Sequence, residues 1–151
     1  MKVIIRNVRE PKVPTKEIRR AIEYYTSLLL TPRQHKNVVL TICFKEFEPF
    51  YKGHTEWLDR PVRPREFKIT LSRRYKSQVT LRTLAHEMVH LQQFVLGELT
   101  GETLRSTIRW KHQEVDDEKI HYYDQPWEIE AFGKEVGLHA RFIAYKNSLK
   151  R

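Results

Sequence analysis

Residues 83–91 read TLAHEMVHL, an H-E-x-x-H pattern set in an apolar helical repeat. On an α-helix, residues four apart lie on the same face, so His86 and His90 can both point a ring nitrogen at one metal ion. Glu87 follows the first histidine directly, which places its carboxylate beside the open position of that metal, where it can accept a proton from water. The pattern therefore predicts a helix that carries two metal ligands and a general base.

The residues around this pattern extend the helix over about 77–96. Apolar side chains cover most of its sides: Val79, Leu81, Leu84, Ala85, Met88, Val89, Leu91, Phe94, Val95 and Leu96. Such a helix is expected to be buried, with Ser77 as its N-cap and Gly97 as its C-terminal stop. A buried polar group without a partner costs about 1–3 kcal/mol, and a metal ion would satisfy both histidines and the glutamate. We therefore favour a metal site over histidines that are only solvated or hydrogen-bonded.

The rest of the chain predicts an α+β fold in one domain over residues 1–151. Strands are expected at 3–5, 38–44, 66–72 and 106–113. Further helices are expected at 14–30, capped by Thr15, and at 126–148. The run 38–44 is apolar on both faces at its start, which favours a central strand, and the proline-rich residues 48–65 predict a loop. Predicted core residues outside the motif helix are Phe67, Ile69, Leu71, Ala131, Phe132, Val136, Leu138, Phe142 and Ile143.

Composition narrows the class of protein. Cys43 is the single cysteine, so no disulfide within the chain is possible, and no apolar run resembles a signal peptide or the roughly 20 residues of a membrane span. We therefore expect a cytoplasmic or virion-associated protein without a membrane partner.

The net charge of +9 is distributed unevenly along the chain. Residues 1–76 carry 18 Lys/Arg against 8 Asp/Glu, and residues 77–151 carry 10 against 11. This basic half is either a surface for nucleic acid or acidic protein, or an ordinary solvated face.

A catalytic zinc ion usually takes three protein ligands, so one more is needed. The extended pattern H-E-x-x-H-x-x-G-x-x-H is excluded, because the chain has Gln93 and Leu96 at its last two defined positions. Residues 126–131, PWEIEA, begin the last helix with two carboxylates. Residues two apart on a helix point in different directions, so Glu128 and Glu130 cannot both face the metal readily.

Glu128 is the better candidate for the third ligand. It shares a face with the small Ala131, whereas Glu130 is spaced for an i,i+4 pair with Lys134 on a solvated surface. A capping role at the start of the helix is the rival interpretation of Glu128. Three other residues are reserve ligands: His112, His121 and Asp124.

Together, residues 83–90 and 126–131 resemble the zincin metallopeptidases, and more narrowly the gluzincin-type group that includes small SprT-like and phage or bacterial proteins. The resemblance covers residues 35–145 in architecture. It implies a zincin-like minimal metallopeptidase domain, in which a mixed sheet packs on the H-E-x-x-H helix and a C-terminal helix supplies the glutamate ligand. It also implies a small residue three positions after that ligand, which matches Glu128 and Ala131.

The chain departs from this family in two respects. Many gluzincins have an aspartate, which orients a metal-binding histidine, where this chain has Phe132. A carboxylate usually fixes the orientation of a ligand histidine, so either Asp116, Asp117 or Asp124 replaces it, or no residue does. The zinc-ribbon cysteines of some SprT-like proteins are absent, which weakens the transfer of DNA-linked substrates to this chain.

The function expected from these features is zinc-dependent hydrolysis of peptide bonds. Zn²⁺ held by His86, His90 and Glu128 would acidify a bound water, and Glu87 would accept its proton and pass it to the leaving amine. Donors to the oxyanion are expected among His121, Tyr122 and Tyr123, and the strand at 106–112 could add an extended substrate to its sheet. Two alternatives stay open: a protein, such as a virion component, in which the metal is purely structural, and a protease docked on nucleic acid by residues 1–76.

Overall fold

Four strands form a mixed sheet with β2 and β4 at its centre. Its order is β1–β2–β4–β3, with β3 antiparallel to β4 and the other neighbours parallel. The computed structural model describes residues 1–6, 12–101 and 108–149. The strands are β1 (Lys2–Ile5), β2 (Val39–Lys45), β3 (Gly53–Trp57) and β4 (Glu66–Ser72). The predictions of an α+β fold, of strands near 3–5, 38–44 and 66–72, and of a central position for 38–44 are confirmed.

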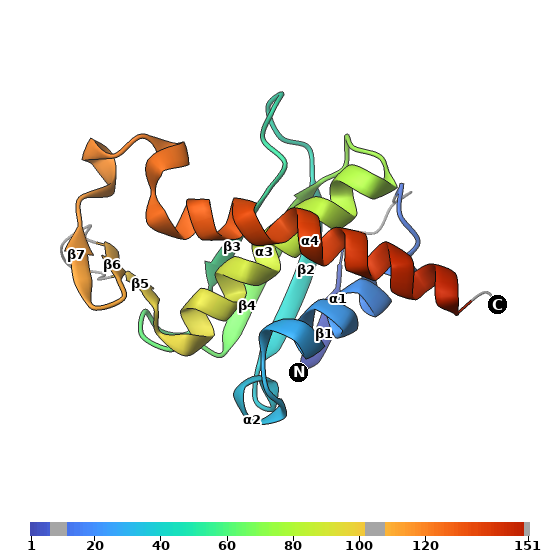
Figure 1. Ribbon diagram of the computed structural model, residues 1–151, viewed down its shortest axis with the longest axis horizontal. Coiled ribbons are helices and arrows are strands. Elements are labelled where there is room, and N and C mark those ends of the chain that lie inside the picture. The colour runs from blue at the N-terminus through green and yellow to red at the C-terminus, as the bar shows by residue number, and fades with distance from the viewer. Residues whose placement is uncertain (7–11, 102–107, 150–151) are drawn as a thin grey trace.

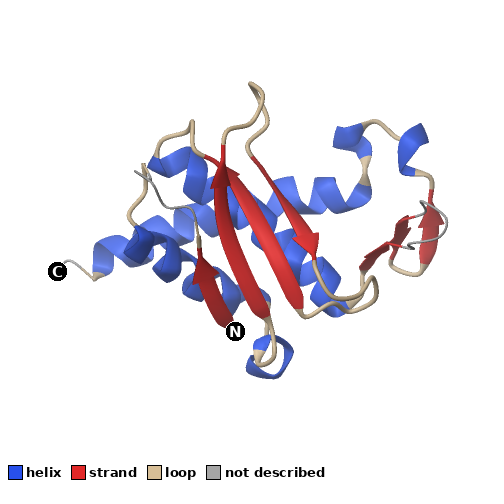
Figure 2. Cartoon of the chain, turned by 180° about the vertical axis from the view of Figure 1, so that it is seen from behind, coloured by secondary structure: helices blue, strands red, loops and turns tan. Residues whose placement is uncertain are grey.

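The central strands bury the side chains of one sheet face. Phe67, Ile69 and Leu71 of β4 have no exposed surface, as predicted from their alternation, and neither do Leu40 and Ile42 of β2. The helices lie on this face, so that Figure 2 shows the opposite face of the sheet in front of them. The hydrophobic core therefore lies between the sheet and the helices on this face.

Strand β3 corrects the prediction that residues 48–65 form a loop. It pairs with β4 from Gly53 opposite Leu71 to Trp57 opposite Phe67. Gly53 and Glu56 have low β propensity and prolines lie on both sides of the strand, although Thr55 and Trp57 favour strands. Pairing with β4 outweighs these local breakers. As the last strand in the order, β3 is an edge of the sheet, and it contacts the helix of the H-E-x-x-H motif.

The helices are α1 (Thr15–Leu29), α2 (Pro32–His35), α3 (Ser77–Leu96) and α4 (Pro126–Ser148). They confirm the helices predicted at 14–30, 77–96 and 126–148, whereas the short α2 was not predicted. Helix α3 contacts β3 and β4 on one side and α4 on another, and Figure 1 shows α4 crossing over it. Within the described ranges, no helix has both the length and the apolar character that a membrane crossing needs.

Only part of the predicted helix capping is correct. Gly97 ends α3 in the left-handed conformation, at a φ of 73°, as a C-terminal glycine stop should. The N-caps of α1 and α3 are Pro14 and Lys76, so the predicted caps Thr15 and Ser77 are wrong. Each of these two residues is instead the first residue of its helix, and neither helix has a side-chain cap bond.

Helix α4 has a buried face that differs in part from the predicted one. Its buried residues include three that were predicted: Ala131, Leu138 and Phe142. Phe132 and Val136 were also predicted to be buried, but they are 37% and 53% exposed, and Ile143 is only partly buried. The buried face instead includes the carboxylates Glu128 and Glu135. Polar residues thus occupy positions that an apolar pattern alone would assign to solvent.

A small antiparallel sheet of order β5–β6–β7 follows α3. Its strands are β5 (Leu99–Gly101), β6 (Ile108–Trp110) and β7 (Gln113–Val115), and two single-turn helices, η1 (Asp117–Lys119) and η2 (Tyr122–Asp124), lead to α4. The strand predicted at 106–113 is confirmed at 108–110, while 106–107 lie outside the described residues. Lys111 and His112 form a turn, with φ values of 46° and 73°.

Candidate metal centre

His86 and His90 of α3 meet Glu128 of α4 in a buried group that could hold a metal ion. One ligand atom from each residue lies within 4.8 Å of the other two. The two Nε2 atoms are 3.1 Å apart, and the Glu128 carboxylate oxygens lie 3.1 Å from His86 Nε2 and 3.3 Å from His90 Nε2. Ala131, one turn further along α4, is fully buried. The structure therefore brings together the three residues that the sequence proposed as ligands.

Glu130 is placed differently from Glu128. Its carboxylate accepts from Lys134 Nζ at 3.0 Å, which confirms the predicted i,i+4 pair. The N-cap of α4 is Gln125, and no side-chain cap bond is formed there, so the capping interpretation of Glu128 has no support. The reserve ligands His112, His121 and Asp124 are exposed and lie outside the group.

Hydrogen bonds on the far side of each ring fix which nitrogen faces the group. His86 Nδ1 lies 2.9 Å from Glu135 Oε2, and because an ionised carboxylate only accepts, Nδ1 must donate. His90 Nδ1 lies 2.8 Å from Gln93 Oε1, while the Gln93 amide nitrogen donates to the Trp127 carbonyl at 3.0 Å. His90 Nδ1 is therefore also a donor. In the neutral rings, each Nε2 lone pair is left facing Glu128.

This donor set fits a metal cation. Two imidazole lone pairs and a carboxylate converge, and such electron-rich atoms repel one another unless a positive charge lies between them. Nitrogens 3.1 Å apart can both reach one ion at the zinc–nitrogen distance of about 2.0–2.1 Å. Imidazole and carboxylate groups suit several divalent metals, so the geometry supports a metal site without selecting the ion.

The electrostatics of the group agree with this preference for positive charge. Burial lowers the pKa of His86, but hydrogen bonds to the Glu128 and Glu135 carboxylates outweigh it and raise the pKa to about 9. Burial raises the pKa of Glu128, but hydrogen bonds from His86, His90 and Tyr122 outweigh that effect and lower it to about 2. In the absence of a metal, the same field favours a proton on the histidines.

Glu87 is buried beside the group but does not belong to it. Its side chain is 4% exposed, and its Oε2 accepts a hydrogen bond from Thr55 Oγ1 of β3 at 2.8 Å. Burial raises the pKa of Glu87, although the charges of His90 and His86 and the bond from Thr55 oppose the shift. A carboxylate with a raised pKa is a stronger base, which suits proton transfer near neutral pH.

Three supporting residues were missed from the sequence: Glu135, Gln93 and Thr55. Glu135 follows Glu128 by seven residues, two helical turns along the same face, so its spacing was a usable signal. Gln93 follows His90 by three residues, which also places it beside that ring. Thr55 had no signal, because β3 itself was not predicted.

The carboxylates proposed to orient a ligand histidine are wrong. Asp116 pairs with Lys119 at 2.6 Å, and Asp117 and Asp124 belong to the single-turn helices η1 and η2. The role falls to Glu135, which Arg82 also holds, with Nη2 2.6 Å from Glu135 Oε1. Arg82, Glu135 and His86 thus form a chain of charged contacts between α3 and α4.

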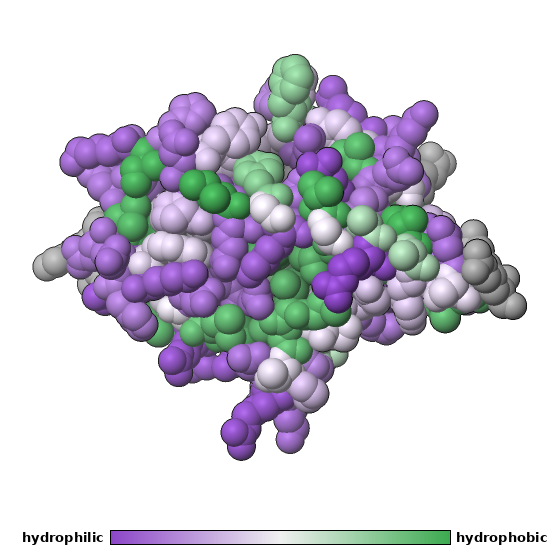
Figure 3. All heavy atoms as spheres, in the orientation of Figure 1, coloured by the Kyte–Doolittle hydropathy of each residue, from purple (hydrophilic) through white to green (hydrophobic). Residues whose placement is uncertain are grey.

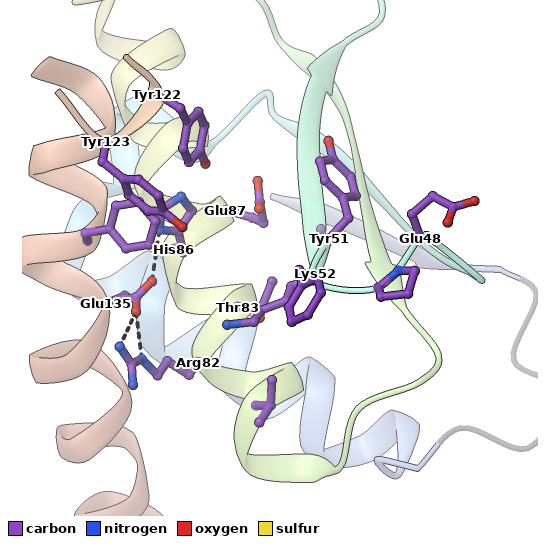
Figure 4. Close-up of a pocket in the computed structure, with 15 residues that line it drawn as sticks. Glu48, Tyr51, Lys52, Arg82, Thr83, His86, Glu87, Tyr122, Tyr123 and Glu135 are labelled. Atoms are coloured by element: carbon purple, nitrogen blue, oxygen red, sulfur yellow. Dashed lines mark hydrogen bonds and ion pairs between the residues drawn. The ribbon is translucent and has the colours of Figure 1, made fainter. Parts of the chain in front are cut away.

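A cavity of about 610 Å³ opens beside His86 and Glu87. Figure 4 shows Tyr122 and Tyr123 on one side of Glu87 and Tyr51 on the other. Tyr122 donates a hydrogen bond to Glu128; together with burial, this contact raises the pKa of the phenol. His121, the third predicted oxyanion donor, does not line the cavity; its ring stacks on Tyr123 at 5.8 Å.

No family model, curated protein or solved structure matches this chain. What the site can do has to be inferred from its own residues. These provide a buried His–His–Glu group that could hold a metal ion, a buried carboxylate beside it, and a cavity that reaches both.

Proposed function

We propose that this chain is a zinc-dependent metallopeptidase with a zincin-like domain. The observation that carries the proposal is the position of Glu87, a buried carboxylate that lines the cavity beside the metal group. A structural zinc site usually closes its coordination with four protein ligands, whereas a catalytic site has three and keeps one position for water or substrate. His86, His90 and Glu128 make a set of three ligands with Glu87 beside it, as in a catalytic site.

Zinc is the proposed ion, because two imidazoles and one carboxylate form a known catalytic zinc set. When bound, Zn²⁺ supplies the Lewis acidity that lowers the pKa of a coordinated water to about 7. Glu135 and Gln93 hold the two imidazoles in the tautomer that presents Nε2 to the ion. The helix packing of α3 against α4 supports the same arrangement, since it brings Glu128 to the two histidines.

Glu87 acts in this proposal as the general base. Its carboxylate accepts the proton of the attacking water and then passes it to the leaving amine. Thr55 holds one carboxylate oxygen and thereby fixes its direction. Tyr123 is better placed than His121 to donate to the developing oxyanion, because it lines the cavity, whereas the Tyr122 hydroxyl already donates to Glu128.

The strand predicted at 106–112 is a poor candidate for binding an extended substrate. Residues 108–110 form β6, the middle strand of the small sheet, so both of its edges are already paired. Strand β3 is the edge of the large sheet, and Thr55 in its centre contacts Glu87. An extended peptide that pairs with the outer side of β3 would pass beside the catalytic groups.

Glu87→Gln tests the proposed function. The zinc-loaded variant should keep its metal and its melting temperature, while hydrolysis of an unfolded protein such as casein should fall about 10²–10⁴-fold. Glu23→Gln, an exposed change on α1, is the matched control and should hydrolyse casein at the wild-type rate. Cleavage at the wild-type rate by Glu87→Gln contradicts the mechanism. A zinc-loaded wild type that cleaves no peptide leaves the structural metal site as the better account.

A further inference from the structure

The loop between β2 and β3 forms an apolar wall on one side of the cavity. Phe50 and Tyr51 of this loop line the cavity, and Phe50 is 91% exposed. Phe50 also has a φ of 77°, a left-handed backbone conformation that residues other than glycine adopt rarely and at a cost in free energy. Figure 3 shows an apolar group protruding at the tip of this loop, at the top of the view. Residues held in such backbone conformations cluster at active sites and ligand clamps.

A second wall faces this loop from η2 and α4. The rings of Tyr122, Tyr123 and Phe132 contact one another, with centroid separations of 5.2 Å, 5.5 Å and 6.3 Å. Phe132 also packs edge-on against the candidate ligand His86, at 4.6 Å. This contact explains why Phe132 is directed to the cavity rather than to the core. The wall is therefore tied directly to the metal group.

The two walls leave room between them. In Figure 4, Glu87 lies in the gap between Tyr51 and the pair Tyr122 and Tyr123. In the part of the chain that the structure describes, no ring contact joins one wall to the other. A cavity of about 610 Å³ is in the range of sites that enclose a small ligand or a large side chain.

The charges around this cavity give it no strong preference for a positive or a negative ligand. The loop contributes Glu48 and Lys52, which have opposite signs, and Arg82 on the other side is paired with Glu135. Aromatic rings, by contrast, favour apolar and aromatic partners by burying their surface. The chemistry of the lining therefore selects by apolar bulk.

We propose that this cleft selects peptides by a bulky apolar side chain next to the cleaved bond, held between the two aromatic walls. The inference rests on the proposed peptidase function, since it places the substrate in the same site. Phe50 and Tyr123 are the residues that determine this specificity, because each is a cavity-lining ring that projects far into solvent.

The test uses blocked peptides that are identical except at one position, which is Phe, Leu, Gly, Glu or Lys. Their binding is measured by calorimetry on the zinc-loaded Glu87→Gln protein, and their cleavage on the wild type. Combined with Glu87→Gln, the double change Phe50→Ala and Tyr123→Ala removes one ring from each wall. Its matched control is Leu58→Ala, an apolar residue that is 53% exposed and lies outside the cavity lining. All variants are compared by thermal melting to establish that they are folded.

The Phe and Leu peptides should bind at least about tenfold more tightly than the Gly, Glu and Lys peptides. The double variant should lose this preference, and Leu58→Ala should keep it. Equal binding of all five peptides, a preference that survives the double change, or no binding at all would overturn the inference. Self-association that the double change abolishes would also overturn it, because the walls would then serve a second copy of the chain. Selective binding without any cleavage would support the cleft and reject the peptidase.

Discussion

Glu135 Oε2 lies 2.9 Å from His86 Nδ1, while Arg82 binds the other oxygen of the same carboxylate. Glu135 thereby fixes the tautomer of a candidate ligand histidine, although it is not itself one of the candidate ligands. The ligand set His86, His90 and Glu128 is therefore only the inner part of the site. Glu135 and Gln93 determine whether the imidazoles are presented correctly.

Removing this support should weaken metal binding. Glu135→Ala is expected to lower zinc affinity about 10–100-fold, because the ring of His86 loses the acceptor that orients it. Competition with a coloured chelator measures the affinity. Glu17→Gln is the matched control, since Glu17 is a helix glutamate paired with Lys146 away from the site. Equal loss of affinity in both variants would contradict a specific role for Glu135.

Metal removal should destabilise the protein. A ligand that binds only the folded state at 100 times its Kd adds about 2.7 kcal/mol of stability, which corresponds to a melting temperature about 5–10 °C higher for a domain of this size. Thermal melting with zinc, and after treatment with a chelator, measures the difference. The shift should disappear in a variant with both His86→Ala and His90→Ala. A chelator that leaves the wild-type melting temperature unchanged would contradict a bound metal.

Asp59 should make the β3–β4 connection sensitive to acid. Burial raises its pKa slightly, but the backbone N–H groups of Arg65 and Glu66 donate to its carboxylate and lower the pKa below its usual value. A carboxylate with a lowered folded-state pKa contributes stability above its unfolded value of about 3.9, and this contribution is lost as pH falls through the folded value. Asp59→Asn should therefore be less stable than the wild type at neutral pH and approach it in acid.

Urea unfolding at neutral pH and near pH 3 measures this difference. The contribution should be small, because the Asp59 side chain is 25% exposed and water screens its interactions. Glu23→Gln is the control, since Glu23 is exposed on α1 and lies outside the β3–β4 connection. A stability difference between the wild type and Asp59→Asn that stays constant with pH would show that the carboxylate charge is not involved.

The inner part of the site could be predicted from sequence because helix geometry determines it. His90 follows His86 by four positions, and Glu128 shares a helix face with Ala131. Both relations follow from the repeat of a single helix. The meeting of the two helices was inferred from the need for a third ligand, and the structure places them in contact.

The rest of the site depends on tertiary contacts that no local pattern contains. Thr55 reaches Glu87 only because β3 pairs with β4 and packs on α3. Phe132 fits an apolar helix pattern, yet its ring lies against His86 at the cavity. Glu128 and Glu135 of α4 are buried because the two histidines and Arg82 supply partners for their carboxylates. A pattern of apolar residues in the sequence does not reveal such partners.

The most direct test of the central claim is the metal content of the purified, untagged protein, measured by mass spectrometry for the wild type and two variants. A metal site built from His86, His90 and Glu128 should hold about one zinc per chain, retained in Glu130→Ala and lost or strongly reduced in Glu128→Ala. Glu130 is the matched comparison, because it belongs to the same helical turn, pairs with Lys134 and reaches His90 only through Gln93. No bound metal after zinc loading, or equal retention by both variants, would contradict a site built from His86, His90 and Glu128.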